Sequence, residues 1–153
     1  MSDLYNVDVS LWSERQAELL RRRAVGELVN EAELDWPNIA EEIVSLATSE
    51  RSRLRSHIWT VLEHLIKLQA CPAMDPPRGW RASIRYARRD IKRTLKHSPS
   101  LRSAVSRLIV EETPDALEYV AAAMSDYGEQ PRVDLASLKF TEDQVVGDWF
   151  PVD

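Results

Sequence analysis

Two histidines and a glutamate have the spacing closest to that of a metal or acid–base site. Glu50, His57 and His64 recur every seven residues, so on a helix they share one face. Seven residues correspond to a rise of about 10 Å, too far for two imidazoles on one ion, and helical metal pairs use positions three or four apart. A Glu-x-x-His metal-binding pair would require a glutamate three residues before each histidine, but those positions are Leu54 and Val61. We therefore expect no metal site and interpret the histidines as hydrogen-bonded residues bordering a core.

The other reactive residues do not form a catalytic signature. Glu41 and Glu42 are adjacent, so on a helix their carboxylates point about 100 degrees apart, which is a poor arrangement for a catalytic pair. Cys71 is the single cysteine and follows a predicted helix end, where the helix dipole raises a thiol pKa. The chain has four glycines and lacks the G-x-S-x-G, P-loop and G-x-G-x-x-G motifs. The sequence predicts no catalytic residue and no cofactor.

The elements that carry these residues are predicted to be helices, because no alternating run rich in Val, Ile and Thr occurs. One helix is expected to start after Ser10, its predicted N-cap. The strongest helical pattern covers residues 35–69, about 50 Å if unbroken, whereas a compact domain of this size has a radius of gyration of about 15 Å. We therefore predict a break or bend near Thr48, with Ser49 capping the second half. Otherwise the protein is elongated or dimeric.

The second half of the chain also reads as helical. Residues 80–96 repeat apolar side chains at helical spacing and predict an amphipathic helix. Pro114 is expected to kink or end a later helix, and Thr113 could cap its continuation. Thr141 and Gln144 have the spacing of a capping box, which predicts a short last helix.

The composition indicates a globular protein. A chain of 153 residues with 44% hydrophobic residues and five tryptophans can bury about 70% of its unfolded surface. We expect a single helical domain over residues 1–153, with an all-α fold: an antiparallel bundle of about five helices with a short C-terminal helix. The longest uncharged apolar run, residues 119–124, is far shorter than the roughly 20 residues that a bilayer requires, and no leader-like segment begins the chain. We expect a cytoplasmic protein without a membrane contact.

Charge is segregated along the chain. Residues 78–107 contain ten Lys and Arg and one acid, a net charge of +9, whereas residues 108–153 carry two basic residues and eleven acids, a net charge of −9. On a helical wheel the cations lie opposite the stripe formed by Trp80, Ile84 and Ile91, away from the expected core contact. We call this cationic side the basic face; its members are Arg81, Arg85, Arg89, Lys92, Arg93 and Lys96.

Three interpretations of the basic face are open. It is solvated or partly neutralised by acids that follow it, including Glu111, Glu112, Asp115 and Glu118. Alternatively, it docks an acidic protein partner or a second copy of the chain, because Arg suits interface ion pairs. The third interpretation is binding of nucleic acid, which a row of cations fits but which the net charge of −5 and the absence of a known motif oppose.

Trp59 lies opposite the stripe of Leu54, Val61 and Leu68 on the wheel, on the same side as Ile66. Either this helix is buried on two sides or these residues form an exposed patch for a partner. We favour burial on both sides.

Several segments together resemble the bacterial family catalogued as domain of unknown function twenty-nine. The resemblance covers nearly the whole chain, and it implies an all-helical bundle without a defined activity. Its more specific pieces are Asn38-Ile39-Ala40-Glu41-Glu42-Ile43, His64-Leu65-Ile66-Lys67, Trp80-Arg81 with Ile84-Arg85, and Ser98-Pro99-Ser100-Leu101.

The resemblance makes Glu42, His64 and Arg85 stronger candidates for functional residues, because they belong to the segments that resemble the family. If these three side chains meet between helices, they form a polar cluster that is either a structural network or a small-ligand site. We expect an uncharacterised bacterial helical protein that acts as an interaction module through the basic helix of residues 78–107. The alternative is a nucleic-acid-associated protein that uses the same Arg and Lys face; a third, weaker hypothesis is a ligand or enzymatic site at the Glu42–His64–Arg85 cluster.

Overall fold

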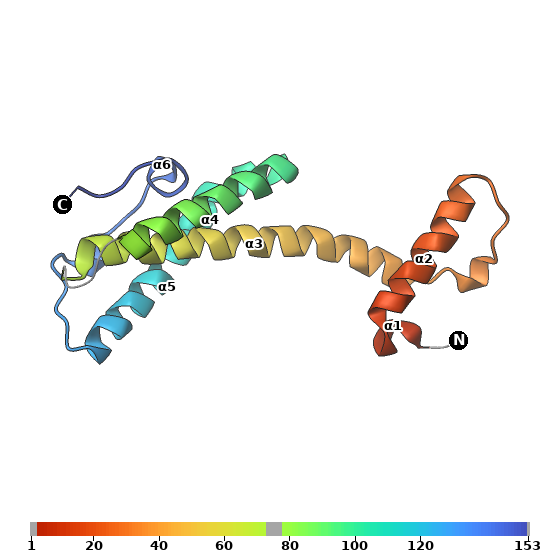
Figure 1. Ribbon diagram of the computed structural model, residues 1–153, viewed down its shortest axis with the longest axis horizontal. Helices are drawn as coiled ribbons and strands as arrows, with labels where there is room; N and C mark the ends of the chain where they lie inside the picture. Colours follow the sequence, from red (N-terminus) through yellow and green to blue (C-terminus); the bar gives the residue numbers. More distant parts are fainter. Residues whose placement is uncertain (1–2, 73–77, 153) are drawn as a thin grey trace. The chain divides into compact units, whose positions relative to one another are not determined.

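The computed structural model of the chain describes residues 3–72 and 78–152, and within those ranges it is helical without a strand (Figure 1). The predicted all-α class is confirmed, as are the expected number of about five helices and the short C-terminal helix. The chain divides into two compact units, Met1–Thr48 and Ser49–Asp153. Folding as one domain over residues 1–153 stays a prediction.

The first unit contains α1 (Leu4–Val7), α2 (Val9–Ala24), the 3-10 helix η1 (Glu31–Glu33) and the start of α3 (Trp36–Ala70). The second unit contains the rest of α3, then α4 (Arg78–His97), the 3-10 helix η2 (Pro99–Ala104), α5 (Val105–Asp126), the 3-10 helix η3 (Leu135–Ser137) and α6 (Glu142–Val146). None of the helices described in these residues is both long enough and apolar enough to cross a bilayer.

The first unit has a small core of Trp12, Leu34 and Ile39. The N-cap of α2 is Asp8 and not Ser10, because the Asp8 carboxylate accepts a hydrogen bond from the backbone nitrogen of Leu11 at 2.9 Å. The prediction for Ser10 was wrong by two residues, since the carboxylate of Asp8 was available as a cap two residues earlier.

Helix α3 is continuous through residue 48, so a break near Thr48, with Ser49 as the cap of a second half, is wrong, whereas a bend there stays a prediction. The Thr48 hydroxyl donates to the carbonyl of Val44 one turn earlier, at 3.3 Å. A hydroxyl that bonds within its own helix does not divert the backbone from its helical hydrogen bonds. The boundary between the two units nevertheless falls at Thr48 and Ser49.

The second unit holds the larger core, to which α3, α4, α5 and α6 contribute. From α3, Leu54 and Val61 are fully buried, and so is Ile66 on the opposite side of the helix. The expectation that this part of α3 is buried on two sides is confirmed. Trp59 packs edge-on against Tyr119 of α5, with ring centroids 5.1 Å apart.

Helix α5 continues through Pro114, so the expectation that this proline ends the helix, with Thr113 capping a new one, is wrong. Proline removes one backbone donor and leaves the carbonyl four residues earlier, that of Val110, without its helical partner. Both Pro114 and Val110 are exposed, so water can bond that carbonyl. The Thr113 hydroxyl donates to Ile109 at 2.6 Å inside the continuous helix.

The predicted capping box of the last helix is confirmed. The Thr141 hydroxyl accepts from the Gln144 backbone nitrogen at 3.3 Å, and the Gln144 side chain accepts from the Thr141 backbone nitrogen at 2.9 Å. Val145 and Val146 are buried, and α6 contacts both α4 and α5.

Candidate anion-binding site

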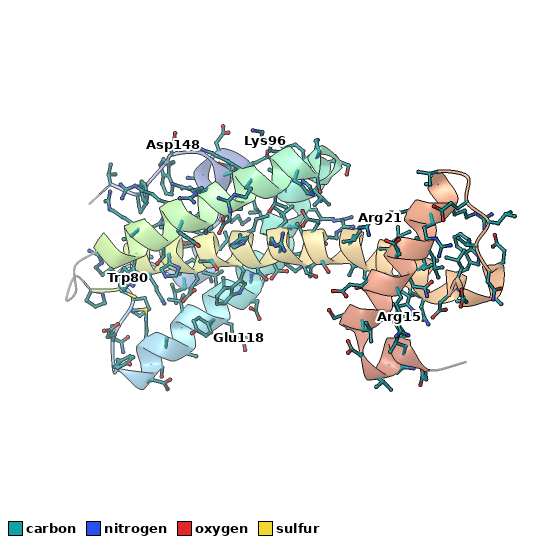
Figure 2. All side chains as sticks on the ribbon, turned by 45° about the vertical axis from the view of Figure 1, so that its right-hand side comes forward. Arg15, Arg21, Trp80, Lys96, Glu118 and Asp148 are labelled. Atoms are coloured by element: carbon teal, nitrogen blue, oxygen red, sulfur yellow. The ribbon has the colours of Figure 1, made fainter. Side chains whose placement is uncertain are left out.

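Helix α4 presents opposite faces to the core and to solvent. Ile84, Ala87 and Ile91 are buried in the core of the second unit. On the basic face Arg81 is half-buried, and the other five members are exposed: Arg85, Arg89, Lys92, Arg93 and Lys96. Figure 2 labels Trp80 near one end of α4, Lys96 near the other end, and Asp148 on the C-terminal segment beside this helix.

Arg88 is the cation of α4 that the sequence did not single out. Its side chain is only 4% exposed, and its guanidinium donates three hydrogen bonds to backbone carbonyls at the end of the chain. Nε donates to Val145 at 2.9 Å, and Nη2 donates to Gln144 at 2.7 Å and to Trp149 at 2.6 Å. The last carbonyls of a helix lack partners within that helix, so Arg88 completes the hydrogen bonding of α6 and fastens it to α4. Burial lowers the pKa of Arg88, although a guanidinium stays protonated in proteins.

Phe150 lies among three guanidinium groups of α4. The central carbons of Arg81, Arg85 and Arg88 are 5.0, 5.2 and 4.8 Å from the centroid of the Phe150 ring. A cation within about 6 Å of an aromatic face is attracted by the ring quadrupole. The ring therefore helps to hold together three like charges that would otherwise repel each other.

Arg85, Arg88 and Phe150 also line a groove of about 570 Å³. Among the residues that the structure describes, four cationic side chains line the groove against one carboxylate, an excess of three positive charges. The carboxylate is Asp148, whose side chain is 97% exposed and whose oxygen lies 3.8 Å from Nζ of Lys92. We call this the Arg88 groove; its lining is Arg85, Arg88, Arg89, Lys92, Asp148 and Phe150.

The acids that follow α4 in the sequence are engaged elsewhere in the second unit. Glu111 pairs with Arg55 at 3.2 Å and with Arg107 at 3.5 Å, and Glu112 pairs with Arg55 at 3.2 Å. Asp115 accepts from the indole nitrogen of Trp59 at 2.7 Å. In Figure 2, Glu118 on α5 lies on the other side of α3 from Lys96.

Few acids contact the exposed members of the basic face. Within residues 3–72 and 78–152, the ion pairs of these five side chains are Lys92 with Asp148 at 3.8 Å and Arg93 with Asp90 at 3.9 Å. The four acids considered for neutralisation make no ion pair with this face in the described part of the chain. Arg85, Arg89 and Lys96 are therefore exposed without an ion pair to any described residue.

The histidines of α3 occupy separate surroundings. Nε2 of His57 is 3.8 Å from a carboxylate oxygen of Asp90 on α4, and Nδ1 of His64 donates to the carbonyl of Thr60 at 2.8 Å. Glu50 pairs with Arg53 at 2.9 Å. His57 and Glu50 share a polar groove of about 410 Å³ between α3 and α4, which His64 does not line. In the described residues, no three His, Cys, Asp or Glu side chains are grouped so that they could hold a metal ion.

The structure gives Glu42, His64 and Arg85 different partners. Glu42 belongs to the first unit and accepts a hydrogen bond from the Tyr5 hydroxyl at 2.6 Å. His64 and Arg85 belong to the second unit, where the first bonds Thr60 and the second stacks on Phe150. No contact among the three is described, and their cluster stays a hypothesis.

Cys71 is buried, which raises the pKa of its thiol.

The fold and the groove define an all-α protein with a concentrated cationic surface. A family model described as "Domain of unknown function DUF29" matches residues 4–149. The chain belongs to this family, as its sequence segments indicated. No curated protein and no solved structure matches the chain.

Proposed function

We propose that this protein is a binding module whose basic face docks an acidic segment of a partner protein. The observation that carries the proposal is the engagement of Glu111, Glu112 and Asp115 with Arg55, Arg107 and Trp59. These acids follow α4 in the sequence and could have neutralised it, but they bond side chains of α3 and α5 instead.

The arrangement of the cations supports a docking surface. They lie on one rigid helix whose opposite side is fixed in the core, so their positions are set before a partner arrives. Preorganised donors lose little entropy on binding, and complementary charge steers partners of opposite sign. Arg is the residue best suited to bidentate contacts with carboxylates. A cytoplasmic location accompanies the proposal as a further prediction.

The proposal is tested by titrating a fluorescently labelled poly-glutamate peptide and following its anisotropy. The variant Arg89→Ala with Lys96→Ala removes two exposed charges from the basic face. We expect it to weaken binding about tenfold, because two charge-assisted contacts of ordinary strength are lost. The matched control, Arg21→Ala with Arg51→Ala, removes the same net charge from exposed positions outside α4 and should change the affinity less than about twofold.

Equal losses in the two double variants would overturn the proposal, because the peptide would then sense only net charge. A single-stranded oligonucleotide is titrated in parallel. Tighter binding of the oligonucleotide than of the peptide, with the same dependence on Arg89 and Lys96, would replace the protein partner by nucleic acid.

A further inference from the structure

We propose that the Arg88 groove is a binding pocket for a phosphate monoester. This inference rests on the proposed function, since the groove lies on the same basic face, and it names the anionic group that the ligand carries. The proposal follows from one buried guanidinium, from the charge balance of the groove and from the way Phe150 holds the surrounding arginines.

Arg88 supplies a preformed donor at the groove. Its side chain is 96% buried, and three carbonyls fix its Nε and Nη2 atoms. The three hydrogen bonds use Nε and Nη2, so the remaining nitrogen, Nη1, is outside them, and Arg88 lines the groove. A guanidinium held in one orientation, with donors left over, is an efficient partner for phosphate oxygens.

The charge balance favours a dianion over a monoanion. The groove has an excess of three positive charges, and a phosphate monoester carries about −1.5 to −2 at pH 7 with three acceptor oxygens. A carboxylate brings one charge and two oxygens, and a phosphodiester of nucleic acid also brings one charge. Asp148 is almost fully exposed, so an incoming phosphate can displace its carboxylate from Lys92 without disturbing the core.

Phe150 holds cations of the groove close together. Arg85 and Arg88 both line the groove and both lie within 5.2 Å of the ring centroid. Because the ring offsets part of their mutual repulsion, the cationic site does not have to be assembled by the ligand. The volume of about 570 Å³ exceeds that of one phosphate and leaves room for the group that carries it.

The first test is calorimetric titration of the full chain with O-phosphoserine, aspartate and serine. We expect phosphoserine to bind at least about tenfold more tightly than aspartate, because it presents a second charge and a third oxygen, and serine not to bind. Phosphoserine affinity should fall between pH 7.5 and pH 5.5, because the phosphate dianion takes up one proton near a pKa of about 6 and becomes a monoanion, whereas aspartate affinity should not. Aspartate binding as tightly as phosphoserine would overturn the inference.

The second test uses two carboxylate variants with the same change in charge. Asp148→Asn removes the one carboxylate that lines the groove in the described part of the chain and should raise phosphoserine affinity severalfold. Asp126→Asn removes an exposed carboxylate outside the groove and should leave the affinity within about twofold. Equal effects of the two variants would overturn the inference. Arg89→Ala, at an exposed position, should weaken phosphoserine binding about tenfold.

Two further ligands identify the source of the phosphate. A phosphoserine peptide that binds more tightly than glycerol 3-phosphate places the phosphate on a protein partner, and the reverse places it on a small molecule. If the poly-glutamate peptide binds the basic face but phosphoserine does not bind, the phosphate inference fails and the proposed function stands. If neither binds, both fail.

Discussion

Arg88 and Trp149 are 61 residues apart in the chain, yet Nη2 of the arginine donates a 2.6 Å hydrogen bond to the carbonyl of the tryptophan. With the bonds to Gln144 and Val145, this contact fastens the C-terminal segment to the side of α4. The same guanidinium then faces Phe150 and the cationic groove. The buried guanidinium of Arg88 therefore both holds the C-terminal segment on α4 and contributes a positive charge to the groove.

Replacing Arg88 by alanine should destabilise the second unit. Three carbonyls lose their donor and Phe150 loses one of its stacked cations, which we expect to lower the free energy of unfolding by about 3 kcal/mol. Urea unfolding measures the loss, and faster hydrogen exchange in α6 locates it. Arg89→Ala, one residue further and exposed, should change the unfolding free energy by less than about 0.5 kcal/mol. Similar losses for the two variants would contradict the role assigned to Arg88.

Replacing Pro114 by alanine should stabilise the protein. Alanine restores the backbone donor that the carbonyl of Val110 lacks and relieves the clash of the proline ring inside α5. Because the site is exposed and nothing must repack, we expect a gain of about 1–3 kcal/mol in the free energy of unfolding. The midpoint of urea unfolding reports the gain. Glu118→Ala, at an exposed site of the same helix, should shift that free energy by less than about 0.5 kcal/mol. A less stable Pro114→Ala protein would show that the proline is accommodated without cost.

The hydrogen bond between Tyr5 and Glu42 predicts a dependence on alkaline pH. That bond is the largest cause of the raised pKa of Tyr5, and desolvation adds to it. A raised folded pKa favours the neutral phenol in the folded state, so its contribution to stability is present below pH 10, the ordinary tyrosine value, and is lost as the pH rises through the folded pKa. In Glu42→Gln the pKa of Tyr5 should fall towards 10.

The pKa of Tyr5 is measured by the absorbance of tyrosinate. The difference between the wild type and Tyr5→Phe isolates this residue from Tyr86, Tyr119 and Tyr127. A Tyr5 titration that is identical in the wild type and in Glu42→Gln would contradict the assigned cause.

Sizing chromatography with light scattering and dual absorbance at 260 and 280 nm, at low and high salt, tests what occupies the basic face after native purification. We expect a nucleic-acid-free protein of one mass at both salt concentrations, because the proposed ligand is an acidic protein segment. Co-eluting nucleic acid that high salt removes would indicate phosphodiester binding, whose affinity falls steeply with salt. That result would favour the nucleic-acid alternative.

Part of the site could be predicted from the sequence, because it depends on local periodicity. The cationic side of α4 follows from the spacing of its Lys and Arg residues, which places them on one side of any α-helix. The helical-wheel position of Arg88 also indicated that this residue is buried. That residue falls on the same side of the helix as Ile84 and Leu95, which are buried, and an arginine among buried positions indicates an internal partner. Which partner it has could not be predicted, because Val145 and Trp149 are more than fifty residues away.

The sequence by itself determined the features that short-range chemistry controls: the all-α class, the capping box of Thr141 and Gln144, and the two-sided burial of α3 around Ile66. Only the tertiary structure decided which charges are neutralised, because an ion pair depends on the packing of distant helices. Arg55 of α3 binds Glu111 of α5 across 56 residues, whereas Arg85, Arg89 and Lys96 of α4 are exposed. The continuity of α3 and α5 also became clear only in the tertiary structure. The Thr48 hydroxyl bonds within its own helix, and the carbonyl that lacks a partner because of Pro114 is exposed to water, so neither residue ends its helix.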